Sequence, residues 1–300
     1  MSTLKGATTS SQVSLPLKWF MPSPQADKCL RAQTIGGKGA FNGKLAKWII
    51  GLMPPHEQYV EPFFGGGSVL LHKNPEGVSE VANDLNSELI NFWAVLRTPE
   101  WFAEFQRCIE ATPFSEAMFQ CAANPRLAEL FSGAVDRAVQ FFILCRQSRQ
   151  GLQKDFATLS KNRTRGGMNE QVSSWLTAVE GLPDVHARLK RVVVLNRPAS
   201  EVIRQMDTPA TVFYLDPPYL HETRSTVDAY KHEMSVEDHQ ALLEQLAGIK
   251  GKFLLSGYRS GIYDVAAESQ GWNRHDYQIA NNASSAAVKE VKTECLWTNF

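Results

Sequence analysis

The 300-residue chain lacks several features that assign a function from composition alone. Its formal net charge is zero, so bulk electrostatics do not indicate a nucleic-acid partner. The five cysteines are odd in number and scattered, which argues against a disulfide framework and a zinc site and favours a reducing, cytoplasmic compartment. No apolar run is long enough for a signal peptide or a membrane span. We therefore expect no metal and no membrane contact.

Two common nucleotide-binding patterns are also missing. Gly65, Gly66 and Gly67 directly follow an apolar run that predicts a buried strand, but the last glycine of the dinucleotide fingerprint is absent. No Gly-Lys-Ser/Thr follows either, which excludes the usual phosphate-cradling loop. These absences disfavour a small-molecule oxidoreductase. Glycines still let the backbone approach a ligand closely, so the triplet favours a loop around something other than a phosphate.

Asp84 provides a carboxylate at the position where a bound nucleoside would need a hydrogen-bond acceptor. Asp84 ends the next predicted strand, roughly twenty residues after the glycines, where it can accept hydrogen bonds from both ribose hydroxyls. An N-cap of the following helix is the simpler alternative. Lys38 follows two glycines ahead of the first predicted helix and could face the carboxylate of a methionine-like group. A surface turn is the alternative for Lys38.

The tetrapeptide Asp216-Pro217-Pro218-Tyr219 follows the apolar run Thr211–Leu215. An open α/β sheet has its active site outside the carboxyl ends of such strands. A carboxylate and a fixed backbone carbonyl can bind both hydrogens of an adenine amine and localise the nitrogen lone pair for attack. The prolines fix φ and remove donors, and the tyrosine offers a face for stacking. With S-adenosylmethionine opposite, this segment predicts methyl transfer to a planar amine, driven by positioning and electrostatics. The alternative is a strand-end turn.

A basic segment interrupts the order of the chain. Apolar periodicity fades over residues 146–180, and Gly166-Gly167 marks a turn or loop tip. We expect residues 146–175 to contact DNA, with a solvated surface as the alternative. Guanine reading suits the arginines Arg146, Arg149 and Arg165. Phosphate contact suits Lys154, Lys161 and Arg163.

Strands that alternate with helices predict an α/β fold with a mostly parallel sheet. The expected strands are Tyr59–Phe64, Val78–Ala82, Arg191–Leu195, Thr211–Leu215, Lys252–Leu255, Asn273–Ile279 and Glu290–Thr298. Residues 1–30 are expected to be a flexible extension. Residues 31–110 and 181–300 are expected to form a catalytic domain, and residues 111–180 an inserted recognition region. We expect aromatic residues 92, 93, 101, 102 and 105 in the core, and His239 at the surface.

The motifs together resemble the Dam-like, D12 class of DNA adenine methyltransferases. The similarity lies in Gln33–Lys38, Glu61–Val69, Asp84 and Asp216–Tyr219, in the order of that family. The closing segment, residues 294–300, is similar to the ends of phage and prophage members. The resemblance implies a Rossmann-like methyltransferase sheet of seven strands with an antiparallel hairpin at one edge, and an inserted, mainly helical DNA-recognition region. It also implies adenine methylation of a base flipped out of duplex DNA.

The resemblance has departures. Thr34 stands where family members often carry a tryptophan that stacks on the donor, so another aromatic residue must serve, with Phe63 and Phe64 as candidates. Residues 145–149 match the GATC-reading enzymes only loosely, so that specificity is not transferred. The expected cofactor-binding residues are Lys38, Phe63, Phe64, Gly65, Gly67, Ser68, Asp84 and Asp216.

Several alternatives stay open. The acceptor could be another planar amine, in RNA adenine, DNA cytosine or a glutamine amide, or the chain could be a non-catalytic DNA-binding relative. Tyr230 could close over the flipped base. We expect a monomer or a weak dimer. The recognition sequence, and a role in restriction-modification, phage protection or regulation, do not follow from the sequence.

Overall fold

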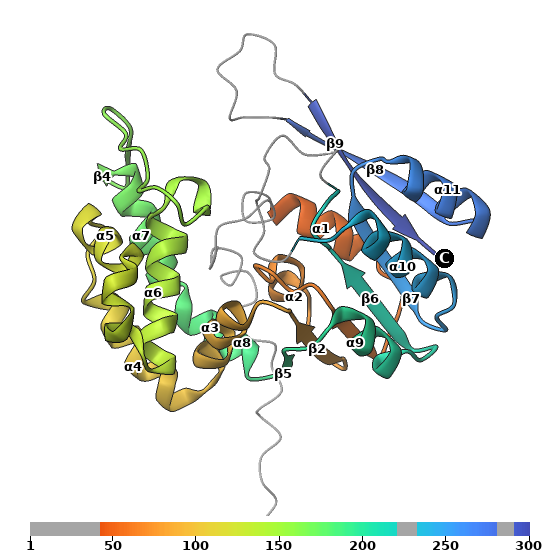
Figure 1. Cartoon of the computed structure of the whole chain (residues 1–300), viewed down its shortest axis with the longest axis horizontal. Helices are drawn as coiled ribbons and strands as arrows, with labels where there is room; N and C mark the ends of the chain where they lie inside the picture. Colours follow the sequence, from red (N-terminus) through yellow and green to blue (C-terminus); the bar gives the residue numbers. More distant parts are fainter. Residues whose placement is uncertain (1–42, 221–232, 281–290) are drawn as a thin grey trace, which may run out of the picture.

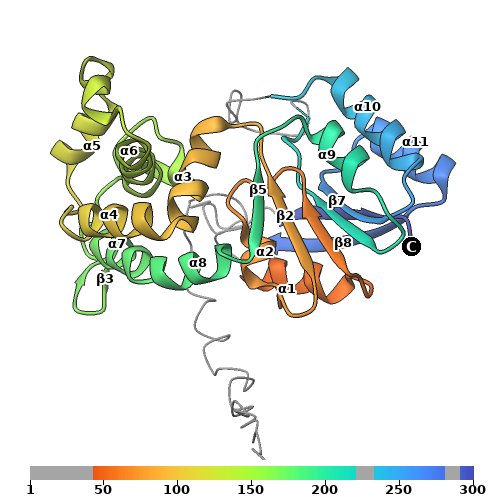
Figure 2. The ribbon, with the colours of Figure 1, turned by 90° about the horizontal axis from the view of Figure 1, so that it is seen from below.

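The computed structural model describes residues 43–220, 233–280 and 291–300. The expected N-terminal extension, the segment Gln33–Lys38 and Tyr230 lie outside these residues. Figures 1 and 2 show a twisted sheet with helices on both faces and a mainly helical lobe beside it. The predicted α/β class is confirmed.

Seven strands form the sheet, in the order β5-β2-β1-β6-β7-β9-β8. Their bounds are β1 (Gln58–Glu61), β2 (Ser79–Asn83), β5 (Val192–Leu195), β6 (Thr211–Leu215), β7 (Lys252–Gly257), β8 (Asn273–Ala280) and β9 (Val291–Thr298). The first five strands in this order pair in parallel, and β9 is antiparallel to both β7 and β8. The mostly parallel sheet and its antiparallel edge are therefore as predicted.

Alternation along the strands divides the core between two helical layers. Tyr59, Ala82 and Val212 pack with α1 (Gly43–Leu52) and α2 (Ser68–His72). Val60 and Phe213, on the opposite face, pack with α9 (Ala199–Met206), α10 (Val236–Ala247) and α11 (Gly261–Gln270). Figure 2 shows the two layers on either side of the sheet. The carboxyl ends of the parallel strands remain as the edge on which a site can form.

The helical lobe is the chain between β2 and β5. Its helices are α3 (Ser87–Arg97), α4 (Pro99–Glu110), α5 (Glu116–Ala123), α6 (Ala134–Gln147), α7 (Glu170–Glu180) and α8 (Leu182–Leu189). Two 3₁₀ turns, Pro125–Phe131 and Arg149–Gly151, and the hairpin of β3 (Thr164–Arg165) and β4 (Met168–Asn169) complete it. The boundaries at residues 111 and 180 stay a prediction.

Four local features differ from what the sequence predicts. The first predicted strand ends at Glu61 instead of Phe64, since Pro62 cannot donate to the sheet. The apolar periodicity that fades over residues 146–180 does not reveal helix α7, because polar residues hide the period of its buried Trp175, Ala178 and Val179. His239 is fully buried, and its Nδ1 lies 2.9 Å from the Tyr263 hydroxyl on α11. Trp101 is 43 % exposed. The other four predicted aromatics are buried.

Candidate active site

Two neighbouring strands bring the two predicted motifs together. β1 and β6 pair in parallel with Gln58 opposite Thr211, so both strands end at the same edge of the sheet. The glycine triplet follows β1, and Asp216 follows β6. The chain passes from β1 towards β2 on one side while β6 lies on the other, which is a topological switch point. Ligands of open α/β sheets bind at such a point.

The glycine loop has a conformation that side chains would prevent. Gly65 and Gly67 have φ of 48° and 66°, in the left-handed region that favours glycine. A Cβ on Gly67 would lie 2.6 Å from Cζ of Phe64. Phe64 is buried against Trp93 with ring centroids 5.1 Å apart, and Trp93 Nε1 donates to the Gly65 carbonyl at 3.1 Å. The aromatic pair therefore supports the loop from the core, and Phe63 beside it is half-buried.

Asp84 connects the end of β2 to the glycine loop. Its Oδ2 accepts a hydrogen bond from the Gly65 amide at 2.9 Å, and its Oδ1 accepts one from the Asn86 amide at 2.9 Å. Asn86 is the N-cap of α3, so the alternative of Asp84 as that cap is wrong. The carboxylate is half-buried, and the side chain of the next residue, Leu85, is 49 % exposed. An acid beside exposed apolar surface suits a nucleoside.

Asn83 is a site residue that the sequence reasoning missed. This fully buried side chain donates from Nδ2 to the carbonyls of Pro62 and Arg197, both at 2.9 Å. Its Oδ1 accepts from the Arg197 amide at 3.0 Å. Asn83 thereby joins the end of β2 to the segments that follow β1 and β5. The available signal was an amide residue at the end of the apolar run that predicted β2.

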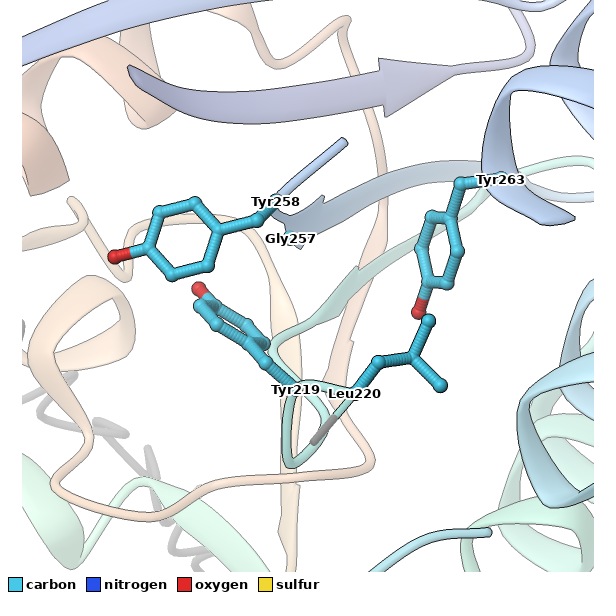
Figure 3. Close-up of a pocket in the computed structure, with 5 residues that line it drawn as sticks. All are labelled: Tyr219, Leu220, Gly257, Tyr258 and Tyr263. Carbon is cyan, nitrogen blue, oxygen red and sulfur yellow. The ribbon is translucent and has the colours of Figure 1, made fainter. Parts of the chain in front are cut away.

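The tetrapeptide after β6 has an exposed beginning and a buried end. Asp216 is exposed, Pro218 is half-buried, and Tyr219 is 5 % exposed. The Tyr219 hydroxyl donates to Oε1 of Glu294 on β9, and its ring meets Tyr258 edge to face at 5.0 Å (Figure 3). Burial, with the charges of Asp216 and Glu294, raises the pKa of Tyr219 well above its usual value. The phenol is therefore a neutral hydrogen-bond donor.

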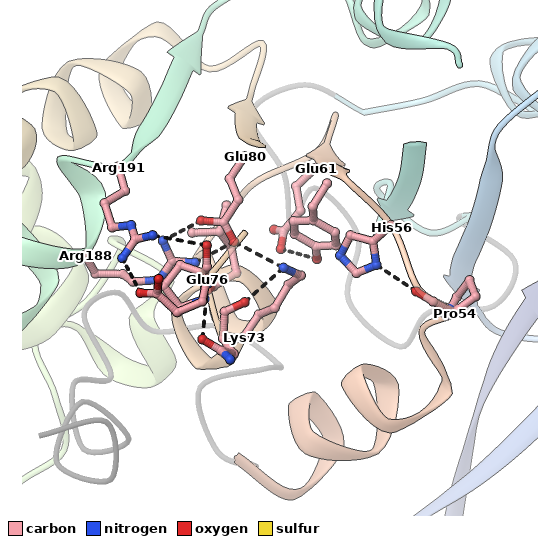
Figure 4. A network of polar contacts seen from close by, with 12 residues as sticks. Pro54, His56, Glu61, Lys73, Glu76, Glu80, Arg188 and Arg191 are labelled. Atoms are coloured by element: carbon pink, nitrogen blue, oxygen red, sulfur yellow. Dashed lines mark hydrogen bonds and ion pairs between the residues drawn. The ribbon is translucent and has the colours of Figure 1, made fainter. Parts of the chain in front are cut away.

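A second buried carboxyl group lies behind the site. Glu61, the last residue of β1, accepts a hydrogen bond from the Tyr59 hydroxyl at 2.7 Å (Figure 4). Burial raises the pKa of Glu61 to about 8, with a smaller contribution from the charge of Asp216. At neutral pH this carboxyl group is mostly protonated. One negative charge is thus removed from the neighbourhood of Asp216.

The sequence model of the family described as D12 class N6 adenine-specific DNA methyltransferase matches residues 35–281. The chain belongs to this family. The expected family, fold and activity are therefore confirmed, and the acceptor is adenine in DNA instead of cytosine, RNA or a protein amide. No curated protein matches the chain.

The cations predicted to contact DNA differ in burial: five are exposed and one is half-buried in the methyltransferase. Arg149, Lys154, Lys161, Arg163 and Arg165 are exposed. Arg146 is half-buried on α6, and its Nη2 donates to the carbonyl and Oγ of Ser174 on α7 at 3.2 and 3.3 Å. Burial also lowers the pKa of Arg146.

The predicted loop tip of the methyltransferase is confirmed. Gly166 and Gly167 have φ of 61° and 77° and connect β3 to β4.

Neither a membrane-spanning helix nor a metal-binding cluster occurs in the described part of the methyltransferase. None of its helices there is both long and apolar enough to cross a bilayer. The same residues contain no group of three or more histidine, cysteine, aspartate or glutamate side chains arranged to hold a metal ion.

Proposed function

We propose that the enzyme transfers a methyl group from S-adenosylmethionine to the N6 amine of an adenine flipped out of duplex DNA. The observation that carries the proposal is the pairing of β1 with β6, since it brings the glycine loop and Asp216 to one edge. Donor and acceptor would then meet in a single crevice. A duplex base is inaccessible within the stack, so it must leave the helix to reach that crevice.

The donor half of the proposal is supported by how well its residues fit a nucleoside. The left-handed glycines expose backbone to a ligand, and the Asp84 carboxylate, held beside Gly65, is a hydrogen-bond acceptor of the kind that a ribose hydroxyl needs. Leu85 provides apolar surface next to that acid, and Phe63 is the less buried of the two candidate phenylalanines. Gly65, Gly67, Ser68 and Asp84 would hold the donor, whose sulfonium supplies the electrophilic methyl group. Lys38 remains an expected contact outside the described residues.

The acceptor half rests on Asp216. Its exposed carboxylate and a backbone carbonyl of the tetrapeptide would accept the two amine hydrogens, which localises the lone pair on nitrogen for in-line attack. The Pro217 and Pro218 rings keep that carbonyl fixed. Tyr219 would contact the base with its ring, once the neighbouring side chains part. The proton leaves the nitrogen after methylation, when the amine is acidic.

The exposed cations of residues 149–165 support a DNA-contacting role for that segment. Arg165 at the hairpin and Arg149 at the 3₁₀ turn are proposed to read bases, and Lys154, Lys161 and Arg163 to contact phosphates. Arg146, which is bound to Ser174, would act by orienting α7. We also propose a monomer or weak dimer in the cytoplasm, and the free thiols of the four described cysteines support that compartment.

Asp216→Ala tests the proposal. We expect methyl transfer to fall at least about 10³-fold, because the amine loses its charged acceptor, while S-adenosylmethionine affinity weakens only in part. Tritium transfer into unmethylated genomic DNA measures the first quantity and calorimetry the second. Asp276→Ala, at an exposed position on β8, is the matched control and should retain activity. Full activity of Asp216→Ala would refute the assignment.

A nucleoside digest of the treated DNA identifies the product. Mass spectrometry should find N6-methyladenine and leave cytosine unmodified. DNA binding without any heat from donor titration would instead identify a non-catalytic relative.

A further inference from the structure

The hydroxyl of Tyr219 has a partner that the chemistry above does not use. Glu294, on β9, is 6 % exposed and accepts the hydrogen bond of that hydroxyl. The two residues are 75 positions apart in sequence. In the sheet, β7 lies between β6 and β9. The Tyr219 side chain, which follows β6, therefore reaches past β7 to the antiparallel hairpin of β8 and β9.

A ring that stacks on a base must keep its plane while its aromatic neighbour changes. In the structure the rings of Tyr219 and Tyr258, which follows β7, meet edge to face with their centroids 5.0 Å apart (Figure 3). A base that enters would replace part of this contact. The phenol oxygen lies in the plane of the ring, so a hydrogen bond at that oxygen can persist whichever group lies against the faces of the ring. Charge assistance makes it stronger than a bond between neutral groups.

We propose that Glu294 is a positioning residue for methyl transfer, because its carboxylate fixes the plane of the Tyr219 ring against which the adenine is placed. Glu294 acts through the tyrosine hydroxyl and does not touch the reacting atoms. The raised pKa of Tyr219 agrees with this arrangement, since the phenol retains the proton that it donates. The inference rests on the proposed function, because it needs Tyr219 to meet the base.

A double-mutant cycle tests the inference. Glu294→Leu leaves the buried hydroxyl without its acceptor, so single-turnover methyl transfer should fall by on the order of tenfold or more. The same change in a Tyr219→Phe enzyme should alter the rate by less than about threefold, since no hydroxyl remains. Affinity for S-adenosylmethionine should stay within about twofold in all variants. Asp276→Asn, at an exposed position of the same hairpin, is the control.

Glu294→Gln provides a milder version that keeps an acceptor of the same shape. It should lower the rate a few-fold when Tyr219 is present and leave the Tyr219→Phe enzyme unchanged. If Glu294→Leu does not fold, this pair of measurements decides the question.

Two results would overturn the inference alone. One is equal rate losses from Glu294 variants in both backgrounds, which would show that Glu294 supports only the fold. The other is no loss when the tyrosine is present. If the unchanged enzyme leaves DNA unlabelled, the proposed function fails first and the inference fails with it.

Discussion

The carboxyl edge of the sheet and residues 149–169, the part of the basic segment that lies beyond α6, are built in opposite ways. The name basic segment is kept below for residues 149–169. At the edge, three side chains are bound to other segments: Asp84 to Gly65, Asn83 to Arg197, and Tyr219 to Glu294. The basic segment has local backbone contacts instead: an isolated β-bridge pairs Ser148 with Phe156, and the Arg149 amide donates to the Asp155 carbonyl at 2.7 Å. Its cationic side chains are exposed.

The difference follows from what each region must do. Transfer between two bound groups depends on atomic positions held to a fraction of an ångström, so the residues around it need fixed neighbours. Attraction to phosphates acts over longer distances and tolerates mobile side chains. Substitutions at the edge should therefore produce large losses of specific steps, and those in the basic segment small and additive losses that depend on salt.

The largest effect is expected beneath the donor loop, at Arg188 of α8. Its guanidinium donates to the Leu70 carbonyl and to Glu80 Oε1, both at 2.8 Å, and lies 2.6 Å from Glu80 Oε2 (Figure 4). This buried contact fixes the helical lobe to α2, which follows the glycine loop. Arg188→Met leaves the buried Glu80 with Lys73 as its remaining ion-pair partner, at 3.4 Å. We expect a loss of about 3 kcal/mol in the free energy of unfolding, measured with urea.

Arg191→Met is the matched control for Arg188→Met. Arg191 pairs with Glu76 at 2.6 Å, but both side chains are exposed, so the loss should be about 0–1 kcal/mol. Equal losses of unfolding free energy for the two variants would show that the buried ion pair at the edge is no more important for stability than an exposed one.

The next effect concerns donor binding at Asp84. Asp84→Ala removes the acceptor of the Gly65 amide and the proposed acceptor of the ribose hydroxyls. S-adenosylmethionine affinity should fall by about 10- to 100-fold, the range expected for lost hydrogen bonds to a charged group. Isothermal calorimetry measures the change. Asp155→Ala, in the basic segment, should leave donor affinity unaltered, and an equal loss there would contradict the comparison.

The same two regions differ in how much the sequence could predict. All seven strands were expected from the sequence, although β8 is mostly polar, and the two motifs follow from local chemistry at strand ends. Motif residues such as Gly65 and Asp216 can be recognised as site residues because their neighbours in the sequence form a characteristic pattern with them. Bonds that join distant segments carry no such signal, because any of many polar residues could supply the partner.

Two contacts illustrate that limit. Arg188 and Glu80 are 108 positions apart, and Tyr219 and Glu294 are 75 apart. Sequence reasoning placed Arg146 in the basic set by charge alone, whereas packing of α6 on α7 binds it to Ser174. The position of a cation in a run of cations does not determine which way its side chain points.

Glu61 allows a pH test of the fixed edge. Its pKa of about 8 in the folded enzyme exceeds the ordinary value of 4.5, so the folded state retains a proton that the unfolded chain releases. This contribution to stability is present in full below pH 4.5 and is lost as pH rises through about 8. Stability should therefore fall across that window by up to about 1.4 kcal/mol per pH unit. Glu61→Gln should flatten the slope in urea unfolding, whereas the exposed Glu57→Gln should keep it.

The smallest effects are expected from single cations of the basic segment. Lys161→Ala and Arg165→Ala should each weaken DNA binding only several-fold near 0.1 M salt, and each should reduce the slope of log affinity against log salt by about 1. Arg163 lies 3.3 Å from Glu170, so its phosphate contact competes with an ion pair and Arg163→Ala should change the slope less. Fluorescence anisotropy across a salt series measures all three. If Arg146→Ala changed the slope as much as Arg165→Ala, the contact between Arg146 and Ser174 would have to break when DNA binds. The DNA-contacting cations would then include one on α6.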